Sequence, residues 1–276
     1  MRFGAGGHGN FGDRMTKHPE PEDPFAEKAR WFDQHYDTTR GRVRFRVLRE
    51  QLREVLPAPP ADVLDAGGGT GRFAAALAAD GYRVTLLDPS GPMLERAEAA
   101  LEPYAENSRI VPGRAEEARS LFGPGSFDAV LLHAVICYVE DPESILSSVA
   151  AVLKQGGILS VVFKNRDALP FRHAAQGRIQ EAMRVLEDPF DAGNLGIVNR
   201  ARTRGEVEEA LARTGFEMRR AYGVRVFADL ISEELEEEDA VEALVALELR
   251  VARLEPYRSV ARLYHLVCER RCAHSD

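Results

Sequence analysis

The feature that most constrains the fold is an alternation of short apolar runs with helix-like segments between residues 62 and 163. Five strands are expected at residues 62–66, 82–87, 109–111, 127–132 and 158–163, with helices between them at 72–79, 92–105, 115–122 and 143–153. Gly156 and Gly157 are the expected stop signal of the last of these helices. Strands that alternate with helices form a parallel sheet through right-handed crossovers. The pattern therefore predicts a doubly wound α/β fold with helices on both faces of the sheet.

The pattern changes after residue 165. Helices are expected at residues 171–186, 205–214 and 231–254, and strands at 216–227 and 259–268. Gly223 would kink the first of these strands. Two strands joined by a long helical insertion, following a parallel sheet, predict an antiparallel pair at its edge.

Composition and charge exclude several classes of protein. The net charge of -8 argues against a generally basic nucleic-acid binder, although it leaves room for a local basic patch. No apolar run reaches the roughly 18 residues of a membrane-spanning helix. Three cysteines make no disulfide framework, and they favour a reducing cytoplasm. Six arginines lie between residues 40 and 53, and an acidic run at 233–242 is expected to form the solvated face of a helix.

A glycine-rich turn, Asp65-Ala-Gly-Gly-Gly-Thr-Gly71, lies between the first expected strand and the first helix. Its glycines let the backbone turn tightly and let a ligand approach without meeting a Cβ. An open α/β sheet binds ligands at the carboxyl ends of its strands, where this turn would lie beside Asp88. A carboxylate at that position can accept both hydroxyls of a ribose. The two features predict a nucleoside site, and the alternative is a simple strand-to-helix turn.

The spacing of the glycines in the turn distinguishes between the known nucleotide-binding motifs. A nicotinamide cofactor favours G-x-G-x-x-G and a P-loop requires a lysine, and the turn has neither. The form D-x-G-x-G-x-G resembles the first motif of class I S-adenosylmethionine-dependent methyltransferases. Residues 114–117, 127–133 and 153–157 resemble further motifs of that family, at the adenine, at the reacting methyl and before the fifth strand. The resemblance implies a Rossmann-like, mostly parallel seven-stranded sheet with an antiparallel C-terminal strand, and S-adenosyl-L-methionine as cofactor.

Segments outside this core resemble a narrower family, the bacterial tRNA carboxyl methyltransferases that act on 5-carboxymethoxyuridine at the wobble position. The similar segments are Tyr36–Arg44, His133–Pro142, Gly223–Asp229, Glu242–Arg250 and Glu255–Tyr257. The resemblance implies that the cofactor pocket is lined by Arg44, Asp65, Gly67, Gly68, Gly69, Asp88, Ala115, Glu116 and His133. Asp65 would organise the loop or meet the amino group of the methionine moiety.

Two departures from that narrower family stand out. Its lysine-rich run corresponds here to residues 188–204, where the basic residues are Arg200, Arg202 and Arg204. Phosphate neutralisation dominates RNA affinity, so this loss lowers the expected affinity for tRNA without touching the chemistry. Cys137 stands where an aromatic residue is expected.

The expected organisation follows from these segments. Residues 1–24 form a glycine-rich flexible tail that lacks the apolar stretch of a secretory signal. Residues 25–276 form one methyltransferase domain, with N-terminal helices (25–56), the cofactor-binding core (60–165) and a substrate-side C-terminal part (166–276). The expected partner is a tRNA anticodon stem-loop or a small-molecule carboxylate acceptor, in the cytoplasm, with no metal and no membrane.

Methyl transfer to a carboxylate needs no general base. A carboxylate with a pKa of about 4 is already ionised at neutral pH. Such a reaction needs in-line positioning, which supplies roughly 7 to 11 kcal/mol, and a cation that holds the carboxylate. An arginine fork suits that task, and the candidates are Arg225, Arg200 and Arg166. His133 would be a base in a methyltransferase that acts on a hydroxyl or amine, or a structural hydrogen-bonding residue.

Three functions are open on the sequence alone. The first is methyl esterification of 5-carboxymethoxyuridine in tRNA, and Tyr36 and Tyr257 are candidates to stack on a base or on the adenine. The second is a small-molecule carboxyl or O-methyltransferase with the same cofactor. The third is a non-catalytic module, against which the intact glycine turn and Asp88 argue.

Overall fold

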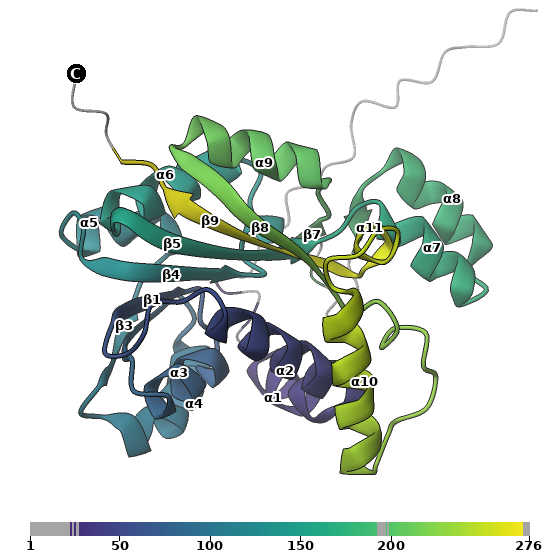
Figure 1. Cartoon of the computed structure of the whole chain (residues 1–276), viewed down its shortest axis with the longest axis horizontal. Coiled ribbons are helices and arrows are strands. Elements are labelled where there is room, and N and C mark those ends of the chain that lie inside the picture. The colour runs from purple at the N-terminus through teal and green to yellow at the C-terminus, as the bar shows by residue number, and fades with distance from the viewer. Residues whose placement is uncertain (1–22, 24, 26–27, 192–196, 198, 273–276) are drawn as a thin grey trace, which may run out of the picture.

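A seven-stranded sheet forms the centre of the molecule in the computed structural model (Figure 1), which describes residues 23, 25, 28–191, 197 and 199–272. The strand order is β3-β2-β1-β4-β5-β9-β8. The strands are β1 Asp62–Ala66, β2 Arg83–Asp88, β3 Ser108–Pro112, β4 Phe127–His133, β5 Leu153–Lys164, β8 Phe216–Val224 and β9 Leu263–Arg270. All neighbours pair in parallel except β9, which runs antiparallel to both β5 and β8. The predicted doubly wound sheet with an antiparallel C-terminal strand is confirmed.

Helices cover both faces of the sheet, in two layers that Figure 1 shows below and above it. One layer contains α2 Thr39–Arg53, α3 Arg72–Ala79, α4 Gly91–Leu101 and α10 Glu238–Val251, with α1 Ala29–Asp37 against α2. The other contains α5 Ala118–Leu121, α6 Pro142–Val152 and α9 Arg204–Arg213. Smaller elements complete the chain: η2 Glu102–Tyr104, η3 Ala115–Glu117, η4 Ile136–Tyr138, α7 Ala168–Ala175, α8 Ile179–Glu187, β6 Phe190–Asp191, β7 Asn199–Arg200 and α11 Tyr257–Val260.

Alternating strand residues supply the two cores. Along β4, Ala129 and Leu131 pack under the α2 layer, whereas Val130 and Leu132 pack under the α6 layer. Neighbouring side chains of a strand point to opposite faces, so a strand buried on both sides is apolar throughout. This is why the apolar runs were readable as strands in the sequence.

The C-terminal half differs from the sequence expectation in its element boundaries. The helix expected at 171–186 is two helices, α7 and α8, because the chain turns at Gly177 with a φ of 73°. Gly156 and Gly157 do not end α6, which stops at Val152; they lie inside β5, where the pairing with β4 is irregular. The strand expected at 216–227 ends at Val224. Its register shift falls between Met218 and Arg220 rather than at the expected kink, Gly223.

The acidic run is not a solvated helix face throughout. The expected helix at 231–254 begins only at Glu238, and the residues before it contact the start of α2. Glu234 accepts a hydrogen bond from the backbone N–H of Thr39 at 2.5 Å, and the Thr39 hydroxyl accepts one from Leu235 N–H at 2.7 Å. Glu238 forms ion pairs with Arg42 and Arg46. The run therefore neutralises part of the arginine cluster.

Two predictions concern segments of which the structure describes only some residues. Of the expected tail, 1–24, only Asp23 belongs to the described residues. Within the expected irregular stretch 188–204, β6 and β7 pair antiparallel, and residues 192–196 and 198 lie outside the described residues. In the described part of the chain, no helix is both long and apolar enough to span a membrane.

Candidate active site

The glycine turn joins β1 to α3 at the carboxyl edge of the sheet. The N–H of Gly67 donates to Leu87 O at 2.7 Å, which ties the turn to the end of β2. Gly67 has a φ of 74°, and a Cβ there would lie 2.4 Å from Val135. A Cβ at Gly69, in contrast, would meet nothing within 4 Å. The turn is tightly packed on the protein side and open at Gly69, as a ligand cradle requires.

Two buried carboxylates face this turn. Asp88 accepts hydrogen bonds from Gly69 N–H at 2.9 Å and from Ser90 N–H at 3.0 Å, one on each oxygen. Asp65 is 3% exposed, and its Oδ2 has no hydrogen-bond partner within the described chain. Burial, together with the Asp88 charge, raises the pKa of Asp65 to about 7. Burial also raises the pKa of Asp88.

Two further segments carry residues that the sequence predicts to line the cofactor pocket. Ala115 is buried at the start of η3, and the backbone oxygen of Glu116 accepts from the Ser148 hydroxyl at 2.7 Å, which fixes η3 against α6. Arg44, on α2, lies close enough to His133 for its charge to help lower the pKa of that imidazole. Arg44 and His133 thus lie near one another, as the resemblance implies.

His133, at the end of β4, begins a buried polar chain. Its Nε2 lies 2.8 Å from the Ser160 hydroxyl on β5, and that hydroxyl lies 2.8 Å from His265 Nε2 on β9. His265 Nδ1 lies 2.7 Å from Gln51 Oε1 on α2. Since the Gln51 oxygen accepts, His265 donates through Nδ1, Ser160 donates to His265, and His133 donates through Nε2 to Ser160.

This chain makes His133 a poor general base. Its Nδ1, the nitrogen that would accept a proton, is buried and has no hydrogen-bond partner among the described residues. Burial first, then His265 and Arg44, hold the pKa of His133 well below its usual value. A base must accept a proton from a bound substrate near neutral pH, and this imidazole is placed to stay neutral. Of the two interpretations of His133, the structure favours the structural one.

The sequence analysis missed the partners of His133. Ser160 is a polar residue within the apolar run of β5, and His265 lies in the equally apolar β9. A polar side chain inside a strand buried on both faces must find a hydrogen bond, and that signal was present in the sequence.

The three arginines predicted to hold an acceptor carboxylate are not equivalent. Arg166 and Arg200 both lie near Glu206, at 3.9 and 3.8 Å, and each is about one third exposed. Arg225 follows β8 directly, is 8% exposed, and donates from Nη2 to Asp229 Oδ1 at 2.5 Å. Arg225 is thus separate from the other two.

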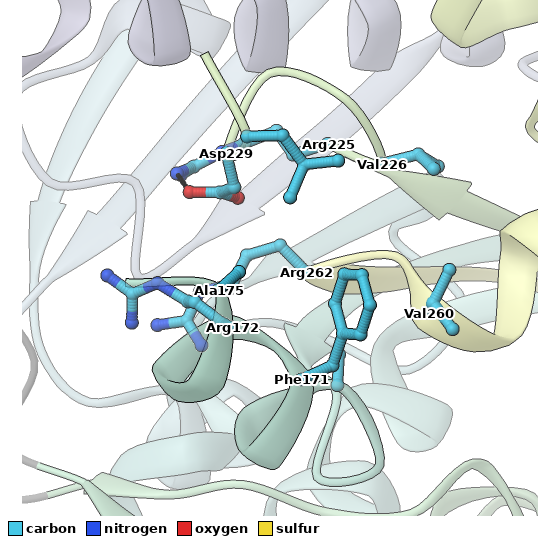
Figure 2. A pocket seen from close by; sticks show the side chains of 10 residues that line it. Phe171, Arg172, Ala175, Arg225, Val226, Asp229, Val260 and Arg262 are labelled. Atoms are coloured by element: carbon cyan, nitrogen blue, oxygen red, sulfur yellow. Dashed lines mark hydrogen bonds and ion pairs between the residues drawn. The ribbon is translucent and has the colours of Figure 1, made fainter. Parts of the chain in front are cut away.

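Arg225 and Asp229 line a cavity at the same edge of the sheet (Figure 2), together with two arginines that the sequence analysis did not select. Arg172 comes from α7 and Arg262 from the residue before β9. Apolar residues, among them Phe171, complete the wall. Burial would raise the pKa of the Asp229 carboxyl, but the charges of Arg225, Arg262 and Arg172 outweigh it and lower that pKa.

The predicted aromatic stacking residues have partners within the protein. Tyr36 packs edge-on against Phe45, and the Arg72 guanidinium lies 4.9 Å from the Tyr36 ring centroid. Tyr257 lies 5.8 Å from Phe227 between ring centroids and is 39% exposed. Tyr257 remains accessible to a ligand, and its stacking role stays a prediction.

Comparison with known proteins identifies the relatives of this chain. Residues 64–161 match the family model described as a methyltransferase domain. The tRNA 5-carboxymethoxyuridine methyltransferase of Escherichia coli K12 is 33% identical over 241 residues, which cover 85% of this chain and 91% of the relative. The chain belongs to the tRNA 5-carboxymethoxyuridine methyltransferase family. It is an S-adenosylmethionine-dependent methyltransferase.

Other similar proteins match a shorter part of this methyltransferase or have a lower sequence identity to it. The ubiquinone biosynthesis O-methyltransferase of Xanthomonas campestris is 31% identical over 163 residues, or 58% of this chain and 67% of the relative. A possible histamine N-methyltransferase of Thermotoga maritima has a TM-score of 0.60 at 19% identity, over 90% of this chain and 99% of that one. The 1,6-didemethyltoxoflavin N1-methyltransferase of Burkholderia thailandensis, solved with S-adenosylhomocysteine, has a TM-score of 0.57 at 18% identity over 90% and 86%. These two structures support the fold.

The residues at the edge of the sheet fit the cofactor. The open face of Gly69 leaves room for a ligand, and the unpartnered oxygen of buried Asp65 suits the ammonium group of the methionine moiety. Each oxygen of Asp88 accepts one backbone N–H and retains a lone pair, so Asp88 can still receive ribose hydroxyls. That Arg44, Asp65, Asp88, Ala115, Glu116, His133 and the glycines bind the cofactor stays a proposal.

Proposed function

We propose that this methyltransferase esterifies the carboxylate of 5-carboxymethoxyuridine at the wobble position of tRNA. The observation that carries the proposal is the extent of its similarity to the Escherichia coli enzyme, which spans 85% of this chain and 91% of the relative. The similarity to the O-methyltransferase spans 58% of this chain. The longer match favours a common acceptor as well as a common methyl donor.

The state of His133 supports a carboxylate acceptor. A phenol or amine must lose a proton during methyl transfer, which calls for a base. The Nδ1 of His133 is buried, and burial holds the pKa of this imidazole well below its usual value, so it is ill suited to that role. A carboxylate is ionised from the start and makes no such demand. The small-molecule O-methyltransferase is therefore the less favoured alternative.

The proposed reaction is one displacement. The cofactor supplies a methyl group bonded to a positively charged sulfur. A carboxylate oxygen forms the new C–O bond while the C–S bond breaks, and the electron pair of that bond stays on sulfur. The products are a neutral methyl ester and S-adenosylhomocysteine, and no proton is transferred.

The chain's own contribution to this reaction is positioning. The glycine turn, Asp65 and Asp88 would hold the cofactor at the ends of β1 and β2, and His133 would form a rigid wall at the end of β4. An arginine would hold the acceptor carboxylate in line with the methyl group. The partner would be the anticodon stem-loop of a tRNA, and we propose the cytoplasm as the site of action.

The test is a reaction with two tRNA substrates. The full chain is incubated with S-adenosylmethionine and tRNA that carries 5-carboxymethoxyuridine, or with the same tRNA lacking that modification. Mass spectrometry of the digested nucleosides should show a gain of one methyl group in the first tRNA only, and mild alkali should remove it as an ester. A modified nucleoside that stays unmethylated with active, donor-binding protein would refute the proposal.

A further inference from the structure

Arg225 has an unusual backbone conformation. Its φ is 64°, and of the non-glycine residues that the structure describes, only Ala134 shares a positive φ. A side chain on a left-handed residue crowds the backbone and costs free energy, so such residues persist where their surroundings enforce them. Ala134 directly follows His133 at the end of β4, so both unfavourable residues lie at the carboxyl edge of the sheet.

A buried carboxylate enforces the conformation that follows Arg225. Glu248, on α10, is 0% exposed and accepts three successive backbone N–H groups. Its Oε2 lies 2.8 Å from Val226 N, and its Oε1 lies 2.8 Å from Phe227 N and 2.9 Å from Ala228 N. A carboxylate that accepts several backbone N–H groups is strongly held, because charge-assisted hydrogen bonds are about twice as strong as neutral ones.

Arg262, the residue directly before β9, fixes the other side of the loop. The carbonyl oxygen of Arg225 accepts from Arg262 N–H at 3.0 Å. Arg225 is therefore held through its own carbonyl and through the three residues that follow it. A glycine would adopt this conformation at lower cost. Since arginine occupies this position despite that cost, we infer that the position requires the guanidinium group and not only the turn conformation.

The guanidinium of Arg225 lies against the Asp229 carboxylate in the wall of the cavity that Figure 2 shows. One of its nitrogens, Nη2, donates to Asp229, while Nε is buried without a hydrogen-bond partner in the described part of the chain. Arg172 and Arg262 line the same cavity, next to the apolar side chains of Phe171 and Val260. Cationic donors beside an apolar wall suit an anionic group carried on an organic arm.

We propose that Arg225 binds the acceptor's carboxylate in this cavity and that Glu248 is the residue that positions Arg225 for it. The inference rests on the proposed function and assigns the substrate-binding residue. Arg172 and Arg262 add positive charge to the same subsite. The carboxymethoxy group has the matching chemistry, a carboxylate on a short arm.

The test compares two anticodon stem-loop RNAs bound to the full chain in the presence of S-adenosylhomocysteine. One RNA carries 5-carboxymethoxyuridine and the other 5-methoxyuridine, so only the first has the carboxylate. The wild-type chain should bind the first RNA at least 10-fold more tightly. Arg225→Gln should abolish this preference while leaving the affinities for the second RNA and for S-adenosylhomocysteine unchanged. Arg225→Lys should retain part of the preference, since it keeps the charge but not the planar fork.

The matched control is Arg219→Gln, which changes an exposed arginine earlier on β8 that pairs with Glu217 and Glu269. This variant should keep the full preference. If Arg225→Gln weakens both RNAs equally, Arg225 contacts a phosphate and the proposal is overturned. If Arg225→Gln keeps the wild-type preference, the proposal is overturned as well.

Glu248 is tested by its kinetic signature. Glu248→Gln and the shorter Glu248→Asp should raise the KM for modified tRNA at least 5-fold and leave kcat and donor affinity unchanged. A merely structural role would instead lower donor affinity and kcat together with acceptor binding, and that result overturns the assignment. Failure of the proposed function would look different, because the wild-type chain would then form no methyl ester on modified tRNA at all.

Discussion

Replacing Asp65 by asparagine should remove a pH-dependent loss of stability from the cofactor-free protein. Asp65 is buried at the end of β1, and burial and Asp88 raise its pKa to about 7. In the unfolded chain an aspartate has a pKa of about 3.9. Between these values the native protein keeps a proton that the unfolded chain has lost. The free energy of unfolding therefore falls as the pH rises, and it levels off above about 7.

The expected magnitude follows from the size of this pH window. Well between the two pKa values each pH unit costs about 1.4 kcal/mol, and the slope halves at the native pKa, so the loss between pH 5 and pH 7 is about 2.3 kcal/mol. That is a large part of the roughly 5 to 15 kcal/mol that holds a typical domain folded. Asparagine has the same shape as aspartate and does not titrate.

The assay is urea denaturation, followed by circular dichroism, at pH 5, 6, 7 and 8 without cofactor. The stability of wild type relative to Asp65→Asn should fall by about 2.3 kcal/mol from pH 5 to pH 7 and by only about 0.4 kcal/mol more to pH 8. Asp62→Asn, on the same strand, is the control: hydrogen bonding to Arg83 lowers the pKa of Asp62, so it adds no slope in this range. An unchanged slope in Asp65→Asn would show that Asp65 is already ionised in the native protein, and the reasoning would be wrong.

Three further predictions concern the rest of the site. Asp88→Ala should weaken S-adenosylmethionine binding about 10-fold or more in calorimetry, because the ribose hydroxyls would lose their acceptor; an unchanged Kd removes Asp88 from the site. Ser160→Ala should lower the free energy of unfolding by about 2 kcal/mol or more, since it leaves buried imidazole nitrogens of His133 and His265 unpaired, and chemical denaturation against wild type measures this. At saturating donor and acceptor, kcat should stay level from pH 8 down to about pH 5.5, because no histidine acts as base; a decline toward acid below pH 6.5 would restore that role to His133, whose pKa is lowered by burial.

The sequence predicted the core of the fold because local and tertiary preferences agree there. The first strand and the helix after the glycine turn lie at 62–66 and 72–79, as expected. Both are apolar segments bounded by glycine or proline, and their burial on the sheet reinforces their local preference. The parallel order of the strands followed from the alternation alone.

Prediction from the sequence was less accurate where contacts between residues far apart in the chain determine the structure. Residues 231–237 have a composition typical of a helix. Glu234 and Leu235 both form hydrogen bonds with Thr39, so this segment packs against the start of α2 instead of forming a helix. Glu248 looked like one more charged residue on a helix. Its role became visible only when the fold placed it below the backbone N–H groups of 226–228.

The candidate site divides in the same way. The cofactor side could be predicted because its residues lie in contiguous motifs, with the glycine turn and Asp88 at the ends of adjacent strands. The acceptor side could not be predicted in full, because Arg172, Arg225 and Arg262 come from three separate segments. Only Arg225 was selected from the sequence.

The pairing of Val224 with Leu263 means that the chain leaves the sheet and returns to it at neighbouring positions. The segment between them, which includes α10, therefore begins and ends at neighbouring positions of the sheet. It lies next to the crevice where the methyl donor is expected to bind. Its length can change while the strand pairs below it stay intact, provided that the buried apolar face of α10 in the α2 layer is kept. Grafting it between relatives would be a direct way to exchange the accepted molecule without rebuilding the site for the methyl source.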